Sequence, residues 1–356
     1  MKYLIALGLM ALFSASHAEV AGESDALVRG NIYVDLVRAG DRVVAVGDRG
    51  HIVYSDDEGR TWQKSTTPTG VLLTAVCFAD ANTGWAVGHD AVVLGTRDGG
   101  KTWEQQYSDL LDPDAPFEDD YYDDDDYSDD YYSDDYYDDD SYADEGFDQG
   151  FAVDTSGAPL LDVWCQSPER ALAVGGYGYV VETTDGGENW TQRTDLIDNP
   201  DGWHFYSVAS LDGRPDVMFV VGEQGTMYRS LDRGVSWETL DSPYHGTFFG
   251  VVSSEPGTLL AFGLQGNIWL SRDRGDSWTK VASGVTSGIS GGAVLDDGTI
   301  VLVGNAGVIL TSRNQGSLFS LRFQPDRRNI SSVLPRKGGG VLVAGASGVR
   351  IIESLQ

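Results

Sequence analysis

A hydroxyl, a carboxylate, a glycine and a tryptophan recur at one fixed spacing in five segments of this chain. The first copy reads Ser55-x-Asp57-x-Gly59-x-Thr61-Trp62. The aspartates of the five copies are Asp57, Asp98, Asp185, Asp232 and Asp273. These oxygens could bind calcium, but a loop of the EF-hand kind needs further oxygen ligands and a closing glutamate, which these turns lack. We favour a structural Asp-box, in which side-chain oxygens bond the turn amides, glycine supplies positive φ and tryptophan covers the hairpin.

A second group of chemistry-bearing residues is the run "EDDYYDDDDYSDDYYSDDYYDDD" from Glu118 to Asp140. Segment 112–150, rich in Asp and Tyr, contains no Lys or Arg and carries roughly a third of the chain's 55 acidic residues. Such a segment is expected to be disordered by itself, because it cannot bury enough apolar surface. The simplest interpretation is a solvated loop that keeps the protein soluble.

Two functional interpretations of this run stay open. It could be a weak calcium site between Asp123 and Asp140, or an acidic arm that engages a cationic protein surface. Tyrosine favours the arm, because its ring stacks on Lys or Arg and calcium has no need of it. The candidate contact residues within the run are Asp123, Asp124, Asp125, Asp126, Tyr131 and Tyr132.

The N-terminal segment "MKYLIALGLMALFSASHA" combines one lysine, a short apolar run and a small-residue cleavage signal. We therefore expect a signal peptide over residues 1–18 and a mature, soluble monomer that is periplasmic or secreted. No cysteine follows the cleavage site, which argues against a lipid anchor. The formal net charge of -31 argues against nucleic acid as a partner.

The elements that hold these residues form a sevenfold repeat of roughly 40 residues. Its first glycines are Gly47, Gly88, Gly175, Gly222, Gly263, Gly304 and Gly345. Each unit contains short β-branched and aromatic runs separated by turns, which predicts four strands per unit. The chain is thus expected to be all-β, with residues 19–356 forming a single seven-bladed β-propeller. The acidic segment 112–150 is an insertion between blades 2 and 3.

The turn that follows each repeat glycine offers a candidate binding surface. A loop joining the outer strand of one blade to the inner strand of the next emerges on this same face, opposite the Asp-boxes, and the acidic insertion is such a loop. We therefore expect a protein partner, from a membrane or envelope complex with a cationic surface, to contact this face. The candidate residues on it are Arg49, His89, Tyr177, Glu223 and Gln265.

Enzymatic activity is not expected, although sialidase-like glycosidases also carry Asp-boxes. Those enzymes need an arginine cluster, a tyrosine nucleophile and carboxylic acids near the propeller axis. The first strands of the repeats supply only Arg38, Arg327 and Arg328. The histidines are isolated and show no metal-ligand spacing, and no cofactor is expected. A carbohydrate-active propeller remains the alternative to a binding scaffold.

Two further expectations concern how the ring is held together. Cys77 and Cys165 lie at nearly equivalent positions on the inner strands of blades 2 and 3, so they form either a disulfide or two small buried side chains. The seventh unit stops before an outer strand. We expect Ala26–Arg29 to pair with Val349–Glu353 and supply it, the alternative being a frayed N-terminus.

The second repeat also resembles a known family. "LLTAVCFADANTGWAVGHDAVVLGTRDGGKTW", from Leu72 to Trp103, looks like the repeat of the photosystem II stability and assembly factor family, exported Asp-box propellers with seven blades. The resemblance extends from about Ile32 to the C-terminus. It implies a non-enzymatic scaffold that helps to assemble or stabilise a membrane complex, and an arginine-rich face that meets a photosystem subunit in the photosynthetic members.

Overall fold

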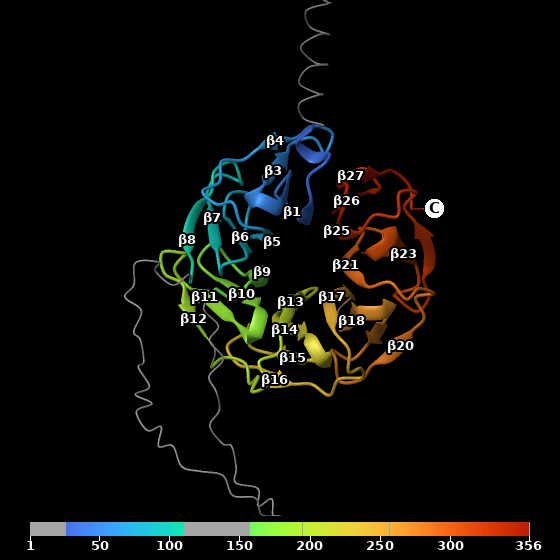
Figure 1. Cartoon of the computed structure of the whole chain (residues 1–356). Coiled ribbons are helices and arrows are strands. Elements are labelled where there is room, and N and C mark those ends of the chain that lie inside the picture. Colours follow the sequence, from blue (N-terminus) through green and yellow to red (C-terminus); the bar gives the residue numbers. More distant parts are fainter. Residues whose placement is uncertain (1–25, 110–156, 194, 256, 356) are drawn as a thin grey trace, which may run out of the picture. The chain divides into compact units, whose positions relative to one another are not determined.

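The computed structural model describes residues 26–109, 157–193, 195–255 and 257–355. The expected signal peptide and the acidic insertion, with its candidate residues, lie outside these ranges. The described part is all-β, with seven antiparallel sheets arranged as blades around a central axis (Figure 1). The prediction of a seven-bladed propeller is therefore confirmed. Among the described residues, no helix is long and apolar enough to cross a membrane.

Each blade is a meander that runs outward from the axis. The inner strands are β1 (Tyr33–Ala39), β5 (Leu73–Phe78), β9 (Leu160–Cys165), β13 (Phe205–Leu211), β17 (Phe248–Glu255), β21 (Ile289–Val294) and β25 (Ile330–Pro335). The second strands are β2 (Arg42–Gly47), β6 (Gly84–Gly88), β10 (Ala171–Gly175), β14 (Arg214–Gly222), β18 (Thr258–Gly263), β22 (Ile300–Gly304) and β26 (Val341–Gly345). The third strands are β3 (Ile52–Ser55), β7 (Val93–Thr96), β11 (Val180–Thr183), β15 (Met227–Ser230), β19 (Ile268–Ser271), β23 (Val308–Ser312) and β27 (Gly348–Ile352).

Six of the described sheets have an outer fourth strand, and the seventh has three strands. The outer strands are β4 (Gln63–Lys64), β8 (Glu104–Tyr107), β12 (Thr191–Gln192), β16 (Glu238–Thr239), β20 (Thr279–Val281) and β24 (Ser320–Phe323). Short 3-10 turns join the second and third strands of five blades. They are η1 (Asp48–Gly50), η2 (Gly176–Gly178), η3 (Glu223–Gly225), η4 (Leu264–Gly266) and η5 (Asn305–Gly307).

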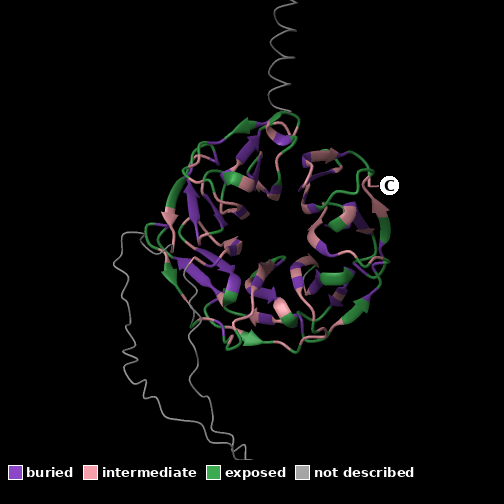
Figure 2. Cartoon of the chain, viewed as in Figure 1, coloured by how far each residue is buried: buried purple, intermediate pink, exposed green. Residues whose placement is uncertain are grey.

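The core lies between neighbouring blades rather than in one central mass. Every residue of β6 and β10 is buried, because each blade is covered by a neighbour on both faces. Between blades 2 and 3, Trp85 and Val87 pack with Val163 and Tyr179 in one such cluster. The outer strands are more exposed than the middle ones (Figure 2). This explains why the second strands read as short, continuous apolar runs.

The predicted Asp-box turns join the third and outer strands, and the hydroxyl and aspartate side chains of each turn form local hydrogen bonds. In the first copy, Ser55 Oγ accepts a hydrogen bond from the amide of Gly59 at 2.8 Å. Asp57 Oδ1 accepts one from the amide of Thr61 at 2.8 Å, and Asp57 Oδ2 one from the Thr61 hydroxyl at 2.6 Å. Trp62 Nε1 donates to the carbonyl of Gly59 at 3.1 Å. The hydroxyl-to-glycine and aspartate contacts recur around Asp98, Asp185, Asp232 and Asp273.

A disulfide joins the two blades that flank the acidic insertion. Cys77 on β5 and Cys165 on β9 are bonded, with 5.8 Å between their Cα atoms and a sequence separation of 88. The register expected from the repeat therefore places the two thiols together. The bond ties blades 2 and 3 at their inner strands.

The expected closure of the ring by strand pairing is wrong. Residues 26–28 form a helical turn, and the sheet of blade 7 contains only β25, β26 and β27. The turn is held locally, since Asn31 Nδ2 and the Tyr33 hydroxyl both donate to the carbonyl of Leu27, at 3.0 and 2.8 Å. It still joins the two ends of the propeller, because Val28 is buried in one cluster with Val349 of blade 7 and residues of blade 1. Among the described residues, the two ends of the propeller are thus joined by side-chain packing and not by a backbone ladder.

This packing predicts that Val28→Ala destabilises the ring. The Val28 side chain is 4% exposed, and loss of two buried methyl groups costs about 2 kcal/mol. The matched control is Val235→Ala, the same truncation at a position that is 65% exposed. Thermal unfolding should show a lower melting temperature for Val28→Ala than for the control. Equal melting temperatures would mean that the turn at residues 26–28 does not close the ring.

Candidate functional site

A cavity of about 510 Å³ lies on the propeller axis and is lined by residues from all seven inner strands. We call it the channel. The inner strands carry a recurring irregularity in register near their start, as between Tyr33 and Asp35 or between Phe248 and Gly250. Such a bulge re-aims successive side chains. As a result, two neighbouring residues of one strand, such as Val34 and Asp35, both face the channel.

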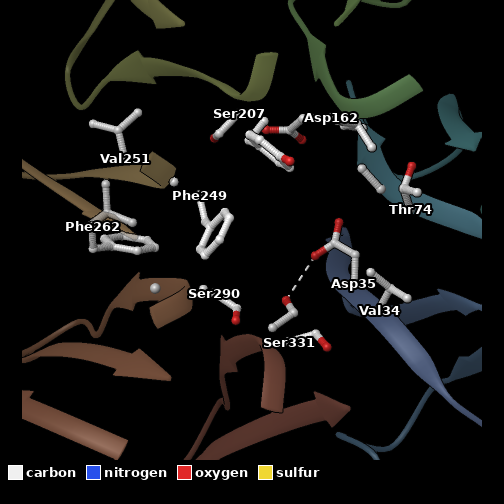
Figure 3. A pocket seen from close by; sticks show the side chains of 18 of the residues that line it. Val34, Asp35, Thr74, Asp162, Ser207, Phe249, Val251, Phe262, Ser290 and Ser331 are labelled. Carbon is white, nitrogen blue, oxygen red and sulfur yellow. Dashed lines mark hydrogen bonds between the residues drawn. The ribbon is translucent and has the colours of Figure 1, made fainter. Parts of the chain in front are cut away.

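Two half-buried carboxylates, Asp35 and Asp162, point into the channel (Figure 3). Both accept hydrogen bonds from neutral groups of neighbouring blades. Asp35 Oδ2 accepts from the amide of Val76 in blade 2 at 3.0 Å, and Oδ1 from the Ser332 hydroxyl of blade 7 at 2.9 Å. Asp162 Oδ2 accepts from the amide of Val208 in blade 4 at 2.9 Å. These carboxylates therefore connect adjacent inner strands around the axis.

Burial in the channel raises the pKa of both carboxyl groups above the usual 3.8 of aspartate. For Asp162 burial raises the pKa to about 7, and the negative charge of Asp35 adds to the increase. The amide of Val208 works in the opposite direction, because it stabilises the ionised form. The residues that line the channel include no lysine, arginine or histidine. Ionised Asp35 and Asp162 thus have no cationic neighbour on the channel wall.

The raised pKa of Asp162 predicts a pH-dependent stability. Between about pH 4 and pH 7 the Asp162 carboxyl keeps its proton in the folded state but has released it in the unfolded state. The contribution of Asp162 to the free energy of unfolding is therefore fully present below about pH 4 and is lost as the pH rises to about 7. In Asp162→Asn the free energy of unfolding should decrease by about 2 to 4 kcal/mol less over this pH range than in the wild type. Denaturant unfolding at several pH values measures the difference. The Asp-box carboxyls titrate outside this window, since hydrogen bonds lower the pKa of Asp185 and of Asp232 to about 2. If the free energy of unfolding changed equally with pH in the wild type and in Asp162→Asn from pH 4 to 7, the raised pKa of Asp162 would be contradicted.

Four aromatic rings lead from the outer surface to the channel, and we call them the aromatic row. Tyr177 and His204 lie 4.6 Å apart between ring centroids, His204 and Tyr206 6.3 Å, and Tyr206 and Phe249 5.4 Å. All three contacts are edge-to-face, the geometry that aromatic pairs prefer. Tyr206 and Phe249 line the channel, whereas Tyr177 is 49% exposed on η2.

Backbone contacts fix the outer end of the aromatic row. Tyr177 lies between two glycines with a φ of 56°, an uncommon conformation for a bulky residue. Its amide donates to Nδ1 of His204 at 2.8 Å, which leaves the imidazole proton on Nε2 when the ring is neutral. Glu223 Oε2 accepts from the amide of His204 at 3.4 Å. The row therefore has a carboxylate beside it at the surface and two more inside the channel.

The turns between second and third strands, including η1 to η5, lie at the opposite end of the third strands from the Asp-boxes. We call this side the η face. It contains all five described candidates from the repeat turns, but only Tyr177 and Glu223 come together, through His204. Arg49, His89 and Gln265 belong to other blades around the ring. Among the described residues, no group of three His, Cys, Asp or Glu side chains could hold a metal ion, and the proposed calcium segment lies outside the described ranges.

The described residues next to the acidic insertion also lie at the η face. Ser108 Oγ donates to the carbonyl of Asp90, in the turn between β6 and β7, at 3.2 Å. Asp109 Oδ2 accepts from the hydroxyl of Tyr179 at 2.7 Å. The chain thus leaves blade 2 on the side of the molecule that carries the aromatic row.

Several residues of the channel and of the aromatic row were not singled out as site residues from the sequence: Asp35, Asp162, His204, Tyr206 and Phe249. A signal for Tyr206 and Phe249 was present, because the inner strands "HFYSV" and "TFFGV" carry aromatic residues where blades 6 and 7 carry serine. The carboxylates had no such signal, since each is a single aspartate in an ordinary strand.

The chain is similar to known proteins in both sequence and structure. A family model described as "Photosynthesis system II assembly factor YCF48" matches residues 62–124 and 148–334. The chain is 35% identical over 174 residues to the photosystem II assembly lipoprotein Ycf48 of Picosynechococcus sp. (strain ATCC 27264 / PCC 7002 / PR-6), and the match covers 49% of each protein. It is 38% identical over 131 residues to the photosystem II assembly protein Ycf48 of Synechococcus sp. (strain JA-3-3Ab), covering 36% of this chain and 39% of that protein. These matches span half or less of the relatives' length.

The fold has close counterparts among solved structures. A structure described as "YCF48 bound to D1 peptide" superposes with a TM-score of 0.64 over 92% of this chain and 95% of that chain, at 17% identity. YCF48 from Cyanidioschyzon merolae superposes with a TM-score of 0.60 over 90% of this chain and 94% of that chain, also at 17% identity. A WD40 propeller domain of Doa1 gives 0.61 at 13% identity, covering 92% and 94%, so these likenesses show the fold alone. The family model, however, matches well over half of the chain, including four of the five predicted Asp-box turns, and the chain therefore belongs to the photosystem II assembly factor YCF48 family.

Proposed function

We propose that this protein is a non-catalytic assembly factor that binds a protein segment of a membrane complex at the η face. The observation that carries the proposal is the aromatic row, which runs from exposed Tyr177 to Phe249 in the channel. Rigid aromatic side chains supply large contact area at low entropic cost, and they are enriched where proteins bind one another. Relatives are named photosystem II assembly proteins, and one counterpart of the fold is described with a D1 peptide bound.

A glycosidase is not favoured, because the arginines that it would need are not gathered in the channel. Arg38 is engaged with Glu58 at 2.7 Å and with the carbonyl of Pro335 at 2.9 Å. The guanidinium of Arg327 lies 3.6 Å from the ring centroid of Phe323, and Arg328 donates to the carbonyl of Ala346. None of the three lines the channel.

The proposal includes export and action as a monomer. The predicted signal peptide at residues 1–18 would direct the chain to the periplasm or outside the cell. The disulfide between Cys77 and Cys165 is consistent with an oxidising compartment, where such bonds persist.

The test is capture of a partner from detergent-solubilised membranes by the tagged mature protein. We expect the wild type to retain an integral membrane protein, and Tyr177→Ala to retain much less of it. The control is Leu318→Ala, which truncates a side chain that is 66% exposed in the turn between β23 and β24, away from the η face. Retention and hydrolysis of glycans, with no membrane protein captured, would contradict the proposal.

The acidic insertion is proposed to strengthen binding to a cationic partner surface. Excision of residues 114–148 with a short Gly/Ser linker should leave the melting temperature nearly unchanged, since surface insertions contribute little beyond loop closure. The captured partner should then bind more weakly and with less dependence on salt, because screened charge contacts are lost. Unchanged binding at every ionic strength would exclude this role.

A further inference from the structure

We propose that the channel binds one cationic side chain, arginine or lysine, presented by the partner segment. This inference rests on the proposed function and names the chemistry that the η face recognises. The segment lies across the aromatic row, and its guanidinium or ammonium group enters the channel between Asp35 and Asp162.

The negative charge of the channel has no counter-charge on the channel wall. An ionised carboxylate offers about four lone-pair positions. Asp35 uses three of them, for the amides of Leu36 and Val76 and for the Ser332 hydroxyl. Asp162 likewise accepts from the amides of Val163 and Val208. Their donors are neutral, and no cation lines the wall, so a cationic guest would supply the missing counter-charge.

The wall of the channel is also partly aromatic. Phe249 points into the same cavity as the two carboxylates (Figure 3), and Tyr206 lines it too. A cation is attracted to the face of an aromatic ring, and more strongly where it is shielded from water. Glu223 at the outer end of the row extends the negative charge to the surface. Rings and carboxylates together favour an organic cation with an apolar stem.

The channel has room for a long side chain. Blades 5 and 6 contribute Gly250, Gly291 and Gly292 to the channel wall. A Cβ at Gly291 would lie 2.5 Å from the carbonyl oxygen of Ser331, so the backbone approach itself keeps this side free of larger residues. The cavity of about 510 Å³ lies within the range of sites that hold small ligands. One arginine side chain fits such a space opposite the carboxylates.

A bare metal ion is a poorer guest. The channel contributes two carboxylates, and no group of three potential ligands occurs among the described residues. Calcium takes six or more oxygen ligands, and aromatic rings add none.

The test compares two short fluorescent peptides that differ in one residue, measured by anisotropy with the mature protein. One peptide carries a central arginine flanked by leucines and glycines, and the other carries citrulline, which keeps the shape without the charge. We expect the citrulline peptide to bind at least tenfold more weakly, which is about 1.4 kcal/mol. A lysine peptide should bind in the same range as the arginine peptide.

A variant of the protein gives a second test. It leaves Asp35 and Asp162 unchanged, because loss of their hydrogen bonds between inner strands could unfold the ring. Ser290→Arg places a cation in the channel from the wall itself, since Ser290 lines it (Figure 3). We expect it to weaken the arginine peptide about tenfold or more. Leu318→Arg, which adds the same charge at a position that is 66% exposed in the turn between β23 and β24, away from the η face, should leave binding unchanged.

Equal affinity for the arginine and citrulline peptides, no binding of either, or full binding by Ser290→Arg would each overturn the channel site. The proposed function is judged separately by capture of the membrane partner. If the wild type captures the partner while the peptides fail to discriminate, the channel site is wrong and the assembly role stands. If capture fails as well, the proposed function is also wrong.

Discussion

Replacing Cys77 and Cys165 together by alanine should lower the free energy of unfolding by about 4 kcal/mol. The disulfide closes a loop with a sequence separation of 88, which includes the whole acidic insertion. A cross-link over so long a loop removes many conformations of the unfolded chain, and the calculated gain grows with loop length. Denaturant unfolding of the wild type and the double variant measures the difference.

Reduction supplies the control for this experiment. The wild type unfolded in the presence of a reductant should match the double variant, which in turn should not respond to the reductant. Two alkylatable thiols in the untreated wild type, found by mass spectrometry, would show that the bond does not form in the mature protein. Equal stability of wild type and variant under oxidising conditions would show that it does not hold the blades.

Trp103→Ala should destabilise the propeller by about 3 to 5 kcal/mol, the usual loss for a buried large aromatic residue. Trp103 is 3% exposed, its ring meets the edge of Phe78 at 6.0 Å, and Nε1 donates to the carbonyl of Gly100 at 3.1 Å. It covers the second Asp-box while packing in the cluster between blades 1 and 2. Its removal therefore costs both the hairpin cover and contacts between blades.

A second Asp-box tryptophan gives the matched control. Trp237 is only partly buried, and its Nε1 has no hydrogen-bond partner. Trp237→Ala should therefore cost less than Trp103→Ala, although both remove the same residue from equivalent turns. Equal losses of stability in the two variants would mean that the tryptophan stabilises the protein through its turn alone and not through packing between blades.

The fold was predictable because its main signals are local and repeated. Each Asp-box closes its hydrogen bonds within a few residues, as Ser55 and Asp57 do with Gly59 and Thr61. The register of the repeat also placed Cys77 opposite Cys165. The turn at residues 26–28 was not predictable in the same way, because its conformation depends on Tyr33 and on packing between the first and last blades.

The candidate site was predicted only in part, for a physical reason. Tyr177 and Glu223 could be identified from the sequence because they lie in the turns of the repeat, and turns between strands lie at the surface. Asp35 and Asp162 belong to strands far apart in the sequence, and they share a cavity only because all seven inner strands converge on one axis. The bulge that turns them inward shows in the backbone pairing and not in the residue types.

The most direct test of the account is to locate the partner on one face of the propeller. A photoreactive benzoylphenylalanine would replace Leu264 on η4, which is 41% exposed, or Leu318 in the turn between β23 and β24 on the opposite face, which is 66% exposed. After irradiation with solubilised membranes, we predict a covalent product with an integral membrane protein from position 264 and none from position 318. A product from position 318 alone, or equal products from both positions, would contradict binding through the η face.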